Sequence, residues 1–168
     1  MFKKIAAATA LILASSATFA AQPNTFYAGA DVGRTKIDDV SGRDTSVGAF
    51  VGYNFHQNFA LEGGYRRLAD KDYRFSGVDA NVRADQLALS VVGSLPVAES
   101  ISVYGRLGVN RLEVKGSAGG FSAKESDTKA LYGVGLSYAI SPVVSARVEV
   151  QKPSSDSTNV SAGVAFQF

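Results

Sequence analysis

The stretch that decides the fold is residues 158–168, Thr-Asn-Val-Ser-Ala-Gly-Val-Ala-Phe-Gln-Phe. From Val160 to Phe168 every second residue is apolar and the residues between are polar or small, which is the period of a β-strand with one apolar face. Segments with this alternation recur from Phe26 onward, at about the ten-residue length that a tilted strand needs to cross a membrane. Eight of them can be counted: 26–33, 46–55, 59–66, 85–95, 101–110, 129–140, 143–151 and 158–168.

The two faces of these segments differ in polarity. One face carries Val, Leu, Ile, Ala, Phe and Tyr without a charge, and a Lys or Arg facing lipid at mid-membrane would cost about 2 to 4 kcal/mol. A water-soluble barrel would instead be apolar inside and polar outside. We therefore predict an all-β fold, an eight-stranded antiparallel transmembrane up-and-down β-barrel. Its opposite, lumen-facing side carries six ionisable residues: Asp31, Glu62, Arg66, Arg106, Arg147 and Glu149.

The connections between the segments alternate in length. Those at 56–58, 96–100 and 141–142 are tight, and 152–157 is short, whereas 34–45, 67–84 and 111–128 are long and polar. Outer-membrane barrels have short periplasmic turns and longer outer loops, so both termini are expected on the periplasmic side. We expect the second loop, 67–84, to continue its hairpin above the membrane.

The N-terminus is predicted to be an export signal. Lys3 and Lys4 precede an apolar run over 5–13, and small residues follow up to Ala20, which predicts a signal peptide over 1–20 and an outer-membrane barrel domain over 21–168. A membrane helix would need roughly 20 apolar residues, and this run is shorter. The whole chain has 17 basic and 15 acidic residues, so loss of both lysines leaves 15 against 15 and no electrostatic case for binding nucleic acid.

The composition excludes several kinds of chemistry. The chain has no Cys and a single His, so disulfides, thiolate metal sites and His-rich metal sites are absent. His56 falls in a predicted periplasmic turn, far from any outer loop where a lipid-modifying enzyme would need a base. No enzyme activity, cofactor or metal is expected. Asp38, Asp39 and Asp44 leave calcium binding open as an alternative to a simply solvated loop.

The six ionisable residues are expected at similar depth, within about 10 Å along the barrel axis, as one layer of three acids and three arginines. Nine of the 12 glycines placed in strands fall on the same face, where a narrow eight-stranded lumen needs room for large side chains: Gly29, Gly33, Gly48, Gly52, Gly64, Gly108, Gly133, Gly135 and Gly163. The favoured interpretation is a static ion-pair plug, and the alternative is a gated ion path.

The last strand resembles the terminal motif of outer-membrane barrels, with Ser161, Gly163, Phe166 and Phe168 at the motif positions. Residues 48–53 and 138–149 are similar to the transmembrane domain of the OmpA-like family of small barrels. The resemblance implies that the barrel assembly machinery recognises the last strand. Nothing follows Phe168, so no peptidoglycan-binding domain or cell-wall anchor is expected.

The same resemblance implies that Glu62 and Arg147 belong to a lumen network proposed to gate conduction in that family. Val92 and Ser137 stand where the family's other paired charges lie, so we expect no switch of partners and a closed lumen.

The expected function is that of a structural, porin-like protein of the cell outer membrane, with outer loops available for surface interaction or adhesion. The alternative is a narrow channel or carrier for small solutes or apolar molecules. Expected partners are membrane lipid and lipopolysaccharide, the barrel assembly machinery during insertion and a loop-binding ligand, and the barrel is expected to be a monomer. Tyr73, Phe75 and Phe121 are the loop aromatics that could contact such a ligand.

Overall fold

The computed structural model describes residues 22–37, 44–75, 78–118 and 121–168 of the chain. Eight β-strands follow one another in chain order: β1 (Thr25–Ile37), β2 (Asp44–His56), β3 (Phe59–Phe75), β4 (Val78–Pro96), β5 (Ile101–Ala118), β6 (Phe121–Ala139), β7 (Val144–Ser154) and β8 (Ser157–Gln167). No helix in these ranges is long and apolar enough to cross a membrane. The predicted signal peptide and two of the three candidate calcium ligands, Asp38 and Asp39, lie outside the described residues.

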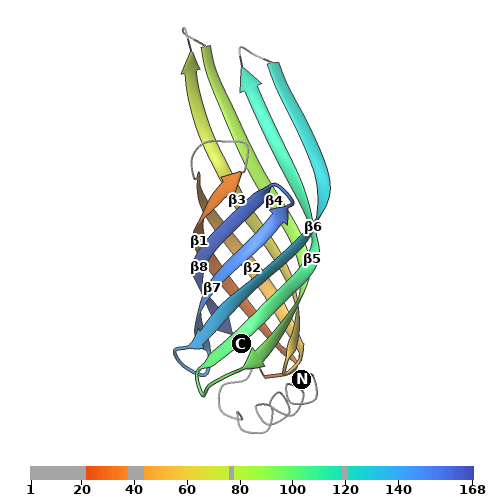
Figure 1. The fold of residues 1–168 in the computed structure, drawn as a ribbon, viewed down its shortest axis with the longest axis vertical. Helices are drawn as coiled ribbons and strands as arrows, with labels where there is room; N and C mark the ends of the chain where they lie inside the picture. The colour runs from red at the N-terminus through yellow and green to blue at the C-terminus, as the bar shows by residue number, and fades with distance from the viewer. Residues whose placement is uncertain (1–21, 38–43, 76–77, 119–120) are drawn as a thin grey trace, which may run out of the picture.

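Each strand pairs antiparallel with the next, and β8 pairs with β1, so the sheet closes into a barrel (Figure 1). The β1–β8 seam runs from Ile37 opposite Ser157 to Tyr27 opposite Gln167. Two backbone hydrogen bonds between Phe26 and Phe168, of 3.0 and 2.8 Å, complete the seam at its end. The closed part of the sheet leaves no described strand at an edge, whereas above it β3 beyond Arg67 and β6 before Tyr132 are each paired on one side only. The predicted eight-stranded antiparallel up-and-down barrel is confirmed.

The two ends of the barrel differ. The tight turns after β2, β4 and β6 lie at the same end as the start of β1 and the end of β8, which we call the turn end. At the opposite hairpin end, β3–β4 and β5–β6 rise well above the other strands (Figure 1). The expectation that 67–84 continues as a hairpin is confirmed, since β3 and β4 pair as far as Phe75 and Val78.

The prediction of a loop over 111–128 was wrong. Strands β5 and β6 stay paired as far as Ala118 opposite Phe121. The sequence alternation fades above residue 110 because strand segments beyond the membrane no longer have to turn an apolar face to lipid. Backbone pairing continues without it.

The barrel is inside out relative to a water-soluble protein. Large apolar side chains cover its outer surface, among them Leu107 at 71 % exposure and Val134 at 65 %. Polar residues are buried in the lumen instead, namely Ser46, Asn54, Glu62, Gln86, Asn110, Gln151 and Asn159. The prediction of a lipid-facing apolar surface is therefore confirmed, and it leaves the lumen as the place where buried polar chemistry is concentrated.

A charged cluster in the lumen as candidate functional site

Four charged side chains meet inside the barrel, and Glu62 of β3 lies at their centre. Glu62 is fully buried and is paired through each carboxylate oxygen. Its Oε1 lies 2.5 Å from Nη2 of Arg106 on β5, and its Oε2 lies 2.9 Å from Nη1 of Arg147 on β7. Tyr27 of β1 donates a hydroxyl hydrogen bond of 2.7 Å to Oε2. Three donors on three different strands thus satisfy one buried carboxylate.

Glu149 is the second acid of this cluster. Nε of Arg106 lies 3.0 Å from Glu149 Oε1, and Nη2 of Arg147 lies 3.9 Å from Oε2. The hydroxyl of Tyr104 donates a hydrogen bond of 2.8 Å to Glu149 Oε2. The two glutamates and two arginines balance one another, which is the condition under which ionised groups persist when they are withdrawn from water.

The Arg147 guanidinium is held between aromatic rings as well as between acids. Its central carbon lies 4.4 Å from the centroid of the Phe50 ring and 4.9 Å from that of Tyr104. Both distances are within the range of cation–π attraction. The rings come from β2 and β5, so two strands besides β7 contact the guanidinium, while Glu62 accepts its hydrogen bond.

Each of the six predicted lumen charges has a glycine opposite it on a neighbouring strand. Glu62 pairs with Gly52, Arg106 with Gly133, Glu149 with Gly135 and Arg147 with Gly163, while Gly48 lies opposite both Asp31 and Arg66.

Two of these glycines also make room for the tyrosines. A Cβ at Gly52 would lie 2.1 Å from the Tyr27 ring, and one at Gly135 would lie 2.5 Å from the Tyr104 ring. Neither position can accept a side chain without moving its tyrosine.

The other two predicted residues form a separate group nearer the hairpin end. Arg66 of β3 contacts Asp31 of β1 at 2.6 Å and also donates to the side-chain oxygen of Asn159 on β8. Asn159 in turn donates to the hydroxyls of Thr35 and Ser46, at 2.9 and 2.7 Å. The expected single layer of six charges is thus two groups, a cluster of four and a pair with its own polar partners.

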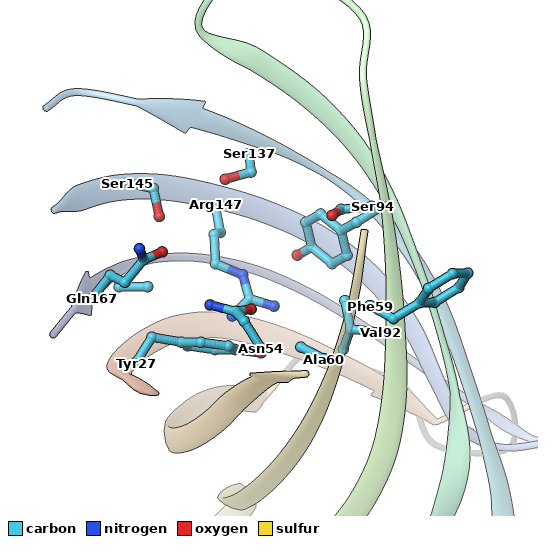
Figure 2. A pocket seen from close by; sticks show the side chains of 12 residues that line it. Tyr27, Asn54, Phe59, Ala60, Val92, Ser94, Ser137, Ser145, Arg147 and Gln167 are labelled. Carbon is cyan, nitrogen blue, oxygen red and sulfur yellow. The ribbon is translucent and has the colours of Figure 1, made fainter. Parts of the chain in front are cut away.

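Little free space remains around the charges. Between the two groups is a space of about 20 Å³, lined in part by Asp31, Glu62, Arg66 and Arg106. That volume holds about one water molecule. Toward the turn end the lumen opens into a cavity of about 120 Å³. Figure 2 shows Arg147 reaching into this cavity, which makes Arg147 the boundary between the filled and the open part of the lumen.

Val92 and Ser137, which stand where the OmpA-like family has its other paired charges, both line this cavity. Val92 packs with Ala60 and Tyr104 in a small apolar cluster, and Ser137 lies in the cavity wall opposite Arg147 on the neighbouring strand. Arg147 is the charged residue of this lining. Neither Val92 nor Ser137 can offer Glu62 or Arg147 an ionic partner.

The sequence analysis missed the aromatic and amide partners of the charges. Tyr27, Tyr104, Phe50 and Asn159 complete the two groups, yet none of them is ionised and none was singled out. A signal for the tyrosines was present, because the alternation turns each of them inward. Each stands opposite a glycine once the strands are paired.

A family model described as the outer membrane protein β-barrel domain matches residues 6–168. The chain belongs to this family. Outer membrane protein A of Salmonella typhi is 31 % identical over 194 residues, covering 99 % of this chain and 55 % of that protein. Outer membrane protein A of Shigella flexneri is 32 % identical over 166 residues, covering 89 % of this chain and 48 % of that protein. The chain spans about half the length of these relatives.

Solved barrels share the fold at low identity. Ail, the attachment invasion locus protein of Yersinia pestis, solved with the heparin analogue sucrose octasulfate, gives a TM-score of 0.60 at 20 % identity over 86 % of this chain and 97 % of that chain. Neisserial surface protein A gives 0.64 at 18 % identity, over 86 % and 96 %. Family and fold together place this barrel in the outer membrane, where barrels have their short turns on the periplasmic side and their long hairpins outside.

The predicted assembly motif lies along the seam of this family member. Ser161 is buried, Gly163 faces the lumen beside Asp31, and Phe166 and Phe168 are exposed on the lipid side with their rings 6.4 Å apart. Recognition by the assembly machinery stays a prediction. His56, predicted to lie in a turn, is the exposed last residue of β2, and its Nδ1 accepts a hydrogen bond of 3.2 Å from the backbone N–H of Asn58 in the turn that follows.

Proposed function

We propose that this protein is a non-conducting structural barrel of the outer membrane that acts at the cell surface through its β3–β4 and β5–β6 hairpins. The observation that carries the proposal is the plugged lumen. A solute would have to pass the cluster of Glu62, Arg106, Arg147 and Glu149, whose charges are ion-paired with one another. The space of about 20 Å³ beside them supports the same conclusion.

The surface role rests on the two tall hairpins. Their backbone pairing continues beyond the apolar band on β3–β4 and β5–β6 but much less on the other strands (Figure 1). These hairpins present strand edges to a partner outside the membrane, because β3 beyond Arg67 and β6 before Tyr132 are each paired on one side only. The complex of Ail with a heparin analogue supports a sulfated polysaccharide as the first ligand to test.

Conductance recordings test the plugged lumen. Purified protein in planar lipid bilayers should show no sustained channels, because breaking the buried cluster costs more than thermal motion supplies. Glu99→Ala, which removes an exposed carboxylate in the β4–β5 turn, is the matched control for Glu62→Ala. Sustained wild-type channels that Glu62→Ala or Arg147→Ala alters, and Glu99→Ala does not, would support the narrow channel instead.

Shortened hairpins test the surface role. Residues 71–82 can be replaced by Asn-Gly between the paired Asp70 and Arg83, and residues 114–125 likewise between the paired Glu113 and Ser126. Cells that display the wild-type barrel should bind to a surface that carries immobilised heparin. Cells with both hairpins shortened should not bind to it. Equal retention by the two strains, with equal amounts of folded barrel, would contradict the surface role of the hairpins.

A further inference from the structure

The turn end of the lumen consists of two adjoining chambers. The inner one is the cavity of about 120 Å³ into which Arg147 reaches, and the outer one has a volume of about 130 Å³. Ser100 of the β4–β5 turn and Ser141 of the β6–β7 turn line the outer chamber, which places it at the mouth of the barrel. The residues that line both chambers are Ser94, Ser137, Ser145 and Gln167. The two chambers thus form one vestibule that leads from the mouth to Arg147.

The vestibule carries a cation and no acid. Among the residues that the structure describes, no aspartate or glutamate lines either chamber, whereas Arg147 lines the inner one (Figure 2). The ionic partners of Arg147, Glu62 and Glu149, are buried and do not reach the lining. A solute that enters from the mouth therefore meets a positive charge before a negative one.

A row of hydroxyl groups lies beside the Arg147 guanidinium. In the register of the sheet, Ser102 of β5 is opposite Ser137 of β6, and Ser137 is opposite Arg147 of β7. The two serines line the vestibule. Neither of them donates to the two glutamates of the charged cluster, whose hydroxyl partners are tyrosines. Their hydroxyls are therefore available to a ligand.

Arg147 also has donor capacity beyond its bond to Glu62. A guanidinium has five N–H donors. Nη1 donates to Glu62 at 2.9 Å, whereas Nη2 lies 3.9 Å from Glu149, which is too long for a hydrogen bond. An acceptor in the vestibule would complete the hydrogen bonding of this arginine.

We propose that the vestibule binds a small carboxylate from the periplasm, held by Arg147 and by the hydroxyls of Ser102 and Ser137. The planar fork of a guanidinium matches the two oxygens of a carboxylate, and serine hydroxyls donate to the lone pairs that remain. The serines of the outer chamber suit a hydroxyl group on the same molecule, so a short hydroxy acid fits both chambers. The site goes beyond the proposed function and depends neither on the hairpins nor on whether the lumen conducts.

The test is a titration followed by solution NMR of the isotope-labelled full chain, refolded in micelles of an uncharged detergent. The probes are lactate and lactamide, which differ in charge but hardly in shape. Lactate should shift the backbone amide signals of Ser102, Ser137 and Arg147 in a saturable way. It should bind about tenfold more tightly than lactamide, which corresponds to about 1.4 kcal/mol. Equal affinity for the two probes, or shifts confined to other parts of the barrel, would overturn the proposal, and neither result needs a variant to fold.

The blocking variant is Ser137→Asp, which places a carboxylate of the chain directly opposite Arg147. It should weaken lactate binding by more than about tenfold, because the internal acid competes for the same guanidinium. Ser155→Asp is the matched control, since it adds the same charge to the exposed β7–β8 turn at the hairpin end, and it should leave binding unchanged. Unchanged binding by Ser137→Asp, in protein that still shows heat-modifiable gel migration, would contradict the proposed place of the ligand. Inorganic phosphate that binds as tightly as lactate would overturn the choice of a carboxylate.

Discussion

The barrel has a tall half, β3 to β6, and a short half, β7, β8, β1 and β2, and the two halves differ on the outside and not on the inside. The tall half continues as two paired hairpins and faces lipid with Leu61, Leu87, Leu89, Leu107 and Leu136. The four strands of the short half contain no leucine and face lipid with valine, with aromatic residues and with Ala28, Ala30, Ala49, Ala146 and Ala162. A hollow of about 740 Å³ in the outer wall lies on this short half, lined by residues of all four strands.

Inside, the same two halves share one set of contacts. Glu62 and Arg106 come from the tall half, and Arg147 and Glu149 come from the short half. Among the described residues three ion pairs cross between the halves: Arg147 to Glu62 at 2.9 Å, Arg106 to Glu149 at 3.0 Å and Arg66 to Asp31 at 2.6 Å. Strand height and outer side chains therefore vary around the barrel, while the ion pairs in the lumen join its two sides.

The largest expected effect comes from breaking the contacts that cross between the halves. Glu62→Ala leaves two buried arginines with one remaining acid and should lower the free energy of unfolding by about 3 to 5 kcal/mol. Urea unfolding in lipid vesicles measures it, with Glu99→Ala as the control. The double variant Glu62→Met with Arg106→Met should be less damaging than Glu62→Ala, because no unpaired charge is left between these two positions. A loss below 1 kcal/mol for Glu62→Ala would mean that the halves do not depend on the cluster.

The second prediction tests whether both halves face lipid. Leu107→Arg on the tall half and Ala30→Arg on the short half each place a charge on the outer wall and should each cost about 2 to 4 kcal/mol if near the bilayer midplane. Thr45→Arg, at the exposed outward position that pairs with Arg34 of β1, is the control and should cost little. The measurement is the same urea titration. A much smaller cost for Ala30→Arg would show that the short half is covered by something other than lipid.

The third prediction concerns the glycines that admit the tyrosines. Gly135→Ala should destabilise the barrel by about 1 to 3 kcal/mol, since the added Cβ would lie 2.4 Å from the backbone oxygen of Val148 and 2.5 Å from the Tyr104 ring. Gly63→Ala is the matched control, because its Cβ would face lipid with its nearest neighbour 4.0 Å away. Equal thermal stability of the two variants would refute the packing argument.

The smallest effect on the stability of the barrel is expected from shortening the tall β3–β4 hairpin. Replacing residues 71–82 by Asn-Gly removes paired backbone above the membrane but none of the lumen contacts. Because hairpins in water are marginally stable on their own, the unfolding midpoint of the spanning barrel should hardly change. Heat-modifiable gel migration checks this directly. A barrel that fails to fold without the tip of β3–β4 would show that the tall hairpin supports the wall below it.

The spanning part of the fold could be predicted because the membrane imposes a rule on every second residue. Val160 to Phe168 has to be apolar on the lipid side, so the strands and their orientation follow from alternation alone. The rule stops at the membrane surface, which is why β5 and β6 were ended too early in the sequence analysis. Above residue 110 the strands are maintained by backbone pairing, and pairing leaves no such pattern in the sequence.

The lumen residues were predictable individually but not as pairs. Inward register identified all six charges, yet which acid meets which base depends on how far neighbouring strands are displaced. A depth estimate from residue counting cannot resolve that displacement, so Asp31 and Arg66 were placed in the same layer as Glu62. Tyr27 and Tyr104 were missed because only ionised side chains were considered, although both are hydrogen-bonded to the buried glutamates.

The pairing of Phe168 with Phe26 makes the wall a ring in which the last strand of the barrel meets the first. Until β8 is in place, β1 presents a bare row of backbone donors and acceptors that any other extended chain could occupy. Closure of the ring therefore requires β1 and β8 to pair with each other. The factor that delivers this polypeptide to the bilayer therefore has to prevent β1 and β8 from pairing with other chains until they pair with each other.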